Sequence, residues 1–208
     1  MNDIPRISFL PKVSRGSIVA IDQKTQQTTT IEFQYNPDTL TRKLTAQAAG
    51  DNADKGEVFR LKGPPEETIS LDIEIDGTDG LAVVNQTTVQ YGVAPTIAAL
   101  ELLIFPDLKT VQENDRLARQ GVIEVVPTEA PLTLFSWGPK RSVPVRLTSF
   151  SIVEEAFDTD LNPIRAKISL ELRVLNYMDL GFDSSGGQSY QTYHKNKETL
   201  AQQRLKGR

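Results

Sequence analysis

ETISLDIEID, at residues 67–76, alternates polar and apolar side chains almost without a break. Successive side chains of an extended chain point to opposite faces, so every second residue of this stretch faces the same way. Four aliphatic side chains share one face: Ile69, Leu71, Ile73 and Ile75. Ser70, Asp72 and Glu74 lie opposite. The pattern predicts a β-strand with one face on a core and the other in solvent.

The same alternation recurs at residues 166–175, AKISLELRVL, which we predict as a second long strand. Residues 17–22 and 28–35 also favour strands, and the polar stretch 23–27 between them predicts a hairpin. Three further segments complete a set of antiparallel strands: residues 120–126, 132–136 and 143–154.

One segment departs from this alternation. Residues 95–105, PTIAALELLIF, are apolar nearly all round, begin with a proline and are followed by Pro106. Proline is favoured in the first helical turn and disfavours continuation of a helix, so a short buried helix is expected here. The predicted fold class is therefore mainly β with one buried helix: a mostly antiparallel sheet or barrel packed by one helix.

Two stretches favour irregular structure. Residues 45–56 are small, polar and glycine-bearing, which is typical of an exposed loop, and residues 183–189, DSSGGQS, predict a flexible joint. Beyond the joint, apolar residues recur at helical spacing and predict a weakly amphipathic helix: Tyr190, Tyr193, Leu200, Ala201 and Leu205. We therefore expect a barrel domain at residues 1–182 and a helical extension at residues 183–208.

Composition narrows the function classes. The chain has 208 residues, 38% of them hydrophobic, and no cysteine, so thiolate metal sites and cysteine nucleophiles are excluded. The net charge of −4 arises from a body of −8 and a basic tail of +4 at residues 190–208. An acidic body argues against nucleic-acid binding. No apolar run approaches the length of a membrane span, and we expect neither a secretion signal nor membrane insertion.

Residues suited to catalysis are sparse. The single histidine, His194, lies in the polar tail, where no rigid scaffold is expected to hold it beside a nucleophile or metal. Four carboxylates cluster at Glu154, Glu155, Asp158 and Asp160, but they lack the spacing of a calcium loop, and a solvated strand connection is the favoured interpretation. Phe135 with Trp137 favours core packing over a ligand platform. We expect no catalytic, cofactor-binding or metal-binding residues, and no cofactor.

The run PLTLFSWGPKRSVPVRLTSFSIVEEAFDTDLNPIRAKISLELRVL, residues 131–175, resembles the tube-like domain family of contractile injection systems. Three features carry the resemblance: FSWG at 135–138 ending one strand, EEAF at 154–157 ending the next, and LNPIRA at 161–166 opening the last long strand. FQYNPDTL at 33–40 and the helical stretch 95–106 are similar to earlier parts of the same family. The resemblance covers about residues 5–180.

This resemblance implies a rolled antiparallel β-barrel or sandwich of phage tail-tube type, followed by the C-terminal helical tail. It also implies a structural protein of a phage-tail-like particle and not an enzyme. Subunits of a tail-tube barrel would form a hexameric ring, a baseplate hub or tube initiator that joins a trimeric spike to the inner tube or to a second initiator protein. The chain would be made in the cytoplasm and then become part of an assembled particle, kept in the cell or released. Polar strand residues would line the channel or face neighbouring subunits, among them Asp72, Glu74, Lys167, Glu171 and Arg173.

Alternatives remain open at this point: an ordinary inner-tube subunit or, from another class, a carbohydrate-binding β-domain or small hydrolase. Members of the family commonly continue into a LysM module, and nothing after Phe182 is similar to one. The stretch 188–208, from Gln188 to Arg208, instead suggests a docking helix for baseplate wedge proteins or for the sheath-side collar. Its deletion is expected to abolish wedge attachment and to leave the barrel folded.

Overall fold

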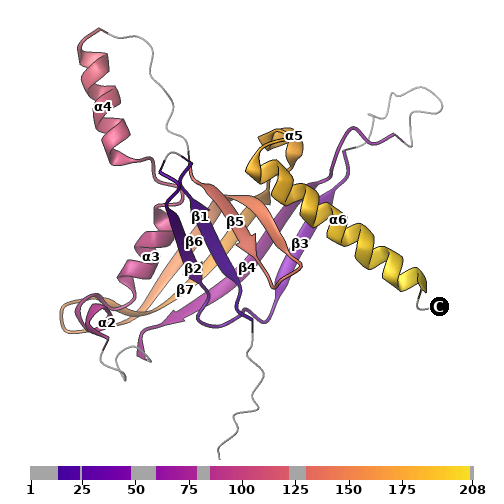
Figure 1. The fold of residues 1–208 in the computed structure, drawn as a ribbon. Coiled ribbons are helices and arrows are strands. Elements are labelled where there is room, and N and C mark those ends of the chain that lie inside the picture. Colours follow the sequence, from indigo (N-terminus) through magenta and orange to yellow (C-terminus); the bar gives the residue numbers. More distant parts are fainter. Residues whose placement is uncertain (1–13, 24, 48–59, 79–84, 122–129, 207–208) are drawn as a thin grey trace, which may run out of the picture.

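A computed structural model of the chain describes residues 14–23, 25–47, 60–78, 85–121 and 130–206 (Figure 1). These residues form one seven-stranded antiparallel sheet in the order β2-β1-β5-β6-β7-β4-β3. The strands are β1 Ser17–Ile21, β2 Thr28–Glu32, β3 Leu40–Thr45, β4 Glu66–Asp76, β5 Leu132–Ser136, β6 Ser142–Phe157 and β7 Pro163–Val174. The helices are α2 Gln86–Tyr91, α3 Ala94–Glu101, α4 Leu108–Arg119, α5 Tyr177–Leu180 and α6 Ser185–Lys206.

The two most regular alternating stretches form the centre of the core. β4 and β7 pair with Leu71 opposite Leu170 and Ile73 opposite Ile168, and all four side chains are buried. Burying an aliphatic side chain of this size stabilises a fold by about 1.5–3 kcal/mol. The alternation in sequence thus fixes which face of each strand turns inward.

The sheet is rolled, so that its two ends share one core. Side chains near β2, such as Ile31 and Phe33, belong to the same buried cluster as Ile73 and Ile75 of β4. The long strand β6 carries a bulge between Leu147 and Ser149, which allows it to bend along its length. Helix α3 packs over the remaining opening through Ile97 and Leu100. The predicted fold class, a rolled antiparallel β-fold of tail-tube type with a buried helix, is confirmed.

Three helix and strand expectations need correction. Helix α3 ends at Glu101, and Leu102, Ile104 and Phe105 are exposed where residues 95–105 were expected to be buried throughout. Strand β3 and helices α2 and α4 were not anticipated. The strand expected at residues 120–126 does not start at Gln120, because Gln120 is the C-cap of α4 and Gly121 has a positive φ of 81°. Residues 122–126 lie outside the described part of the chain.

The flexible joint expected at residues 183–189 is helix from Ser185 onward. Gly186 and Gly187 are buried, and a Cβ placed on Gly187 would lie 2.0 Å from the Gly181 carbonyl oxygen. The glycines therefore allow α6 to approach the backbone before it. The boundary between a domain at 1–182 and an extension at 183–208 remains a prediction. Of the loop expected at residues 45–56, only Thr45, Ala46 and Gln47 are described, and Thr45 still belongs to β3.

Helix α6 crosses one end of the sheet and then extends beyond it (Figure 1). Tyr190 and Tyr193 are each 3% exposed and belong to the main hydrophobic core. From Glu198 to Lys206 every side chain is exposed. Removal of residues 188–208 would take both tyrosines out of this core, so we now predict that it destabilises the barrel, contrary to the expectation from sequence. No helix within the described ranges is long and apolar enough to span a membrane.

Candidate functional site

The residues first considered for catalysis do not come together. The His194 side chain is 49% exposed, and its nearest carboxylate is that of Glu198 on the same helix, at 3.9 Å. Its ring lies 6.4 Å from that of Tyr190. Hydrogen-bonding geometry for a general base is not present at these distances.

The carboxylates of the β6–β7 connection serve local structure. Asp158 accepts hydrogen bonds from the Asn162 side chain at 2.8 Å, the Asn162 amide at 2.8 Å and the Asp160 amide at 2.9 Å. These bonds, the side-chain bond first, lower the pKa of Asp158 below its ordinary value. Glu155 pairs with Lys167 at 3.0 Å. No group of three or more potential metal ligands occurs within the part of the chain that the structure describes.

Phe135 and Trp137 pack as core residues. Their rings stack with centroids 6.0 Å apart, and the centroid of the Phe33 ring lies 6.3 Å from that of Phe135. Gly16 leaves no room beside them, since a Cβ there would lie 2.7 Å from the Phe33 ring and 2.8 Å from that of Trp137. This agrees with the packing interpretation.

The sheet has two open edges, β2 and β3, and no further strand lies beside either in the described residues. The Phe33 amide donates to the Gly16 carbonyl, so by the alternation of antiparallel pairs the backbone groups of Thr28, Thr30 and Glu32 point away from β1. On β4, the amide of Gly77 points toward β7. The same alternation therefore directs the backbone groups of Arg42 and its alternate neighbours on β3 outward.

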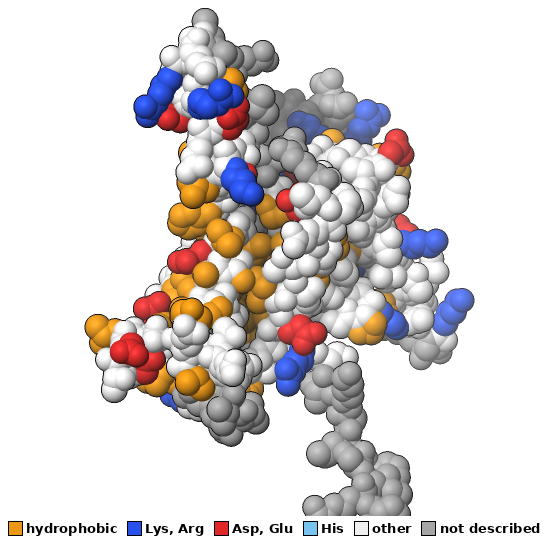
Figure 2. All heavy atoms as spheres, turned by 60° about the vertical axis from the view of Figure 1, so that its left-hand side comes forward, with side chains coloured by type: hydrophobic (Ala, Val, Ile, Leu, Met, Phe, Trp, Pro, Cys, Tyr) orange, Lys and Arg blue, Asp and Glu red, His pale blue; other side chains and the backbone are white. Residues whose placement is uncertain are grey.

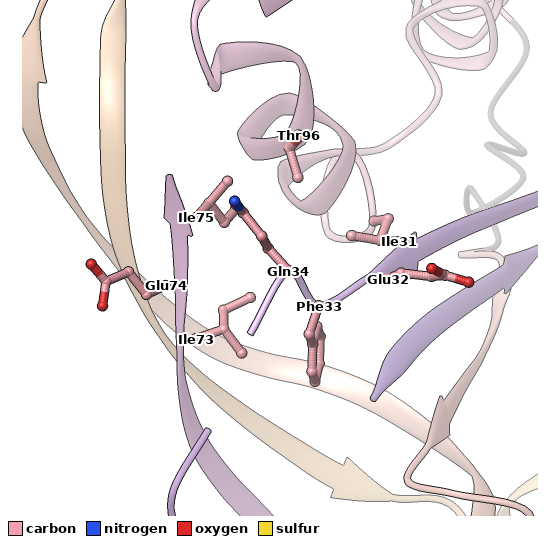
Figure 3. Close-up of a pocket in the computed structure, with 8 residues that line it drawn as sticks. All are labelled: Ile31, Glu32, Phe33, Gln34, Ile73, Glu74, Ile75 and Thr96. Carbon is pink, nitrogen blue, oxygen red and sulfur yellow. The ribbon is translucent and has the colours of Figure 1, made fainter. Parts of the chain in front are cut away.

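The two ends of the rolled sheet approach each other at a cavity of about 110 Å³ (Figure 3). Its lining comes from the end of β2, from β4 and from α3: Ile31, Glu32, Phe33, Gln34, Ile73, Glu74, Ile75 and Thr96. The Gln34 carboxamide bridges the gap, because its Nε2 donates to the Asp76 carbonyl and its Oε1 accepts from the Asp76 amide, both at 2.8 Å. One side chain thus makes the two bonds that a neighbouring strand would make.

The outward face of β3, β4, β7 and β6 forms a shallow groove of about 300 Å³. Most of its lining side chains are hydroxyls, with two carboxylates among them: Thr39, Thr41, Ser70, Ser149, Ser151, Ser169, Asp72 and Glu171. Other polar residues of this face are paired, Arg173 with Asp179 at 3.0 Å and Arg165 with Asp76 at 2.7 Å. The groove is therefore lined mainly by polar side chains.

A buried charge lies at the opposite end of β4. Glu67 is 1% exposed and points to the core side, where both of its carboxylate oxygens are hydrogen-bonded. Oε1 accepts from Arg42 Nε at 2.6 Å and from the Tyr193 hydroxyl at 2.9 Å, while Oε2 accepts from Lys197 Nζ at 3.1 Å. Arg42 Nη2 also donates to the Tyr193 oxygen at 2.9 Å. We call these four residues the Glu67 cluster.

Burial and charge act in opposite directions within the Glu67 cluster. Burial alone would raise the pKa of the Glu67 carboxyl, but the hydrogen bonds from Tyr193 and Arg42 and the nearby cations hold that pKa below its ordinary value. Burial, reinforced by the Glu67 charge, raises the pKa of the Tyr193 hydroxyl. Burial lowers the pKa of Lys197.

Sequence analysis missed this cluster, although one signal was available. Glu67 shares the parity of Ile69 and Leu71 in the alternating stretch, so a carboxylate occupies a position on the apolar face. Its partner Tyr193 lies 126 positions away.

A broad band of hydrophobic side chains is exposed on one side of the molecule, from the foot of α4 past α3 (Figure 2). The exposed large apolar residues of α2, α4 and the α3–α4 connection are Val89, Tyr91, Leu102, Ile104, Phe105, Leu108 and Val111. Exposed apolar patches of this kind mark contact surfaces in proteins.

A family model described as contractile injection system tube protein matches residues 12–180. No curated protein matches the sequence significantly. Among solved structures, a tail of an empty GTA particle with C6 symmetry shares 12% identity over 76% of this chain and 90% of that chain, with a TM-score of 0.31. A native gene transfer agent virion chain shares 11% identity over 76% of this chain and 95% of that chain, with a TM-score of 0.26. These scores are too low to support a conclusion about assembly.

Proposed function

The chain belongs to the family of contractile injection system tube proteins, and from this premise we propose that it forms the ring that joins the spike to the inner tube. Its role is structural, and the ring contains six copies. The observation that carries the proposal is the pair of unlike open edges, β2 and β3, at opposite ends of one sheet.

Unlike edges favour a ring over a simple dimer. When the β2 edge of one copy pairs with the β3 edge of the next, the growing assembly still has one unpaired β2 edge at one end and one unpaired β3 edge at the other. Such a contact continues until the rotation closes, and closure leaves no open edge. The hydroxyl-rich groove would then face the channel, where a hydrated surface adheres weakly to passing cargo.

The projecting elements favour an initiator over an ordinary inner-tube subunit. Helix α4 and the second half of α6 both extend away from the barrel (Figure 1). An inner-tube subunit stacks on copies of itself, whereas a ring with unlike faces stops after one layer. We propose that the spike trimer binds one face and that the inner tube or a second initiator binds the other.

The exposed half of α6 is the part of the chain best placed to contact baseplate wedge proteins. It carries Arg204 and Lys206 in its last turn, and every side chain from Glu198 to Lys206 is exposed. A chain that ends at Lys197 keeps the buried tyrosines. We expect this truncation to reduce wedge binding while the ring still forms, and unchanged wedge binding would contradict the assignment.

Mass photometry of the purified protein, alone and with the spike protein, tests the ring. A closed species of six copies on one spike trimer supports the initiator role, and open-ended stacking would instead indicate an inner-tube subunit. A persistent monomer that does not bind the spike would contradict both.

Disulfide trapping tests the edge pairing, because the chain has no native cysteine. A Thr30→Cys, Lys43→Cys double variant should give a ladder of oligomers on oxidation, with Thr28→Cys in place of Thr30→Cys to allow for a two-residue shift in register. Each single variant should stop at dimers. Rings without any ladder in either double variant would refute pairing through these edges.

A further inference from the structure

Strand β3 is held by a neighbour on one side only. It pairs with β4 from Leu40 opposite Leu71 to Thr45 opposite Glu66, and its other edge is open. A strand in this position depends on its side chains to stay in place, because half of its backbone groups face away from the sheet. Arg42 lies opposite Ile69 and therefore points to the core side of the sheet.

Arg42 links this edge strand to the terminal helix. Its Nε donates to Glu67 at 2.6 Å and its Nη2 donates to the Tyr193 hydroxyl at 2.9 Å. The same hydroxyl donates to Glu67 at 2.9 Å, so three elements, β3, β4 and α6, meet at one oxygen. Lys197 closes the group from the next turn of α6, with its ammonium 3.1 Å from Glu67 and 4.0 Å from the centre of the Tyr193 ring.

The members of the cluster depend on one another. When a single partner of a buried carboxylate leaves, the groups that remain lose hydrogen bonds without gaining full access to water. Undocking of α6 would remove Tyr193 and Lys197 together, so that Arg42 and Glu67 would be left to rearrange at the end of β3. Docking of the helix and ordering of the edge strand are therefore coupled.

We propose that α6, when docked, holds strand β3 in place through the hydrogen bond between the Tyr193 hydroxyl and the Glu67 carboxylate. We call α6 in this role the splint of β3. The β3 edge is ready to receive the β2 edge of a second copy only while α6 is docked. This last step rests on the ring proposed above. The terminal helix thus supports the assembly surface from behind, because it orders the strand that pairs with the next copy.

Tyr193→Phe tests the splint, because it keeps the buried ring and removes only the hydroxyl. Tyr190→Phe is the matched control, since it lies on the same helix face, is equally buried, and its hydroxyl is not part of the cluster. We measure hydrogen exchange of the amides in β3. The loss of charge-assisted hydrogen bonds should speed their exchange by roughly tenfold to a hundredfold in Tyr193→Phe and leave Tyr190→Phe unchanged.

A second pair of variants keeps the test decisive if Tyr193→Phe folds poorly. Lys197→Met removes the cation that binds Glu67, whereas Lys195→Met removes an exposed cation two positions away on the same helix. Faster exchange in β3 for Lys197→Met alone supports the proposal. Unchanged β3 exchange in both Tyr193→Phe and Lys197→Met would overturn it.

Mass photometry of the same variants separates the two proposals. A wild-type chain that forms no ring contradicts the proposed function, while the exchange measurement still decides whether α6 supports β3. Rings that form from wild type and equally well from Tyr193→Phe, despite a loosened β3, would refute the link between the splint and assembly.

Discussion

Two truncations of α6 should separate a folding defect from a binding defect. A chain that ends at Gly187 loses Tyr190 and Tyr193, which are each 3% exposed, and also Lys197. Tyr193 and Lys197 are two of the three partners of Glu67. Removing one large buried aromatic side chain costs about 3–5 kcal/mol. Two such losses, roughly 6 kcal/mol or more, approach the whole stability of an ordinary domain, which is about 5–15 kcal/mol.

Of the described residues, a chain that ends at Lys197 loses only exposed ones, and its free energy of unfolding should stay within about 0.5 kcal/mol of the full-length value. Urea denaturation followed by fluorescence measures both chains, because Trp137 is the single tryptophan and stacks on the buried Phe135. The chain ending at Gly187 should be largely unfolded before urea is added. A chain ending at Gly187 with the midpoint and slope of full-length protein would refute the assignment of α6 to the core.

Three smaller perturbations test other contacts. Gln34→Ala removes both 2.8 Å bonds to Asp76 and should lower the free energy of unfolding by about 1–3 kcal/mol, whereas the exposed Gln202→Ala should leave it unchanged. Gly187→Ala should lower the free energy of unfolding by about 1–3 kcal/mol, because the new methyl group meets the Gly181 backbone. A thermal melt measures this loss, and a wild-type melting temperature would contradict the close approach. The pKa of Glu67 is held below its ordinary value of 4.5, so its contribution to stability is present above that value and is lost as the pH falls through the lowered pKa. Stability measured against pH should therefore differ between wild type and Glu67→Gln at pH 7 and converge in acid, and a constant difference would exclude a titrating Glu67.

Local patterns predicted the elements whose signal is local. The alternation at 67–76 and 166–175 became β4 and β7, the segments on either side of the polar stretch 23–27 pair as the β1–β2 hairpin, and residues 132–136 became β5 without a shift. Helix α4 escaped notice because few of its residues are apolar. It is stabilised instead by Asp107, which caps its first turn, and by surface ion pairs such as Glu113 with Arg116.

The candidate site was less accessible to sequence reasoning. Glu67 could have been noticed in the sequence, because its carboxylate lies on the apolar face of its strand. No nearby residue, however, indicates which groups bind it. Gln34 gave no such signal. In the sequence, a glutamine whose carboxamide makes the hydrogen bonds of a neighbouring strand cannot be distinguished from a glutamine in solvent. In both cases the meaning of the residue comes from groups that only the rolled sheet brings within hydrogen-bonding distance.

By itself, the sequence determined the β class and the inward faces of the long strands. The run at residues 131–175 also indicated the contractile injection system family. These follow from periodicity and short motifs, which act over a few residues. Only the tertiary structure decided that the two glycines of the tail are packing positions, that α6 belongs to the core, and that β2 and β3 are the open edges. Strand order and the satisfaction of buried charge depend on contacts between residues more than a hundred positions apart, and no local pattern encodes them.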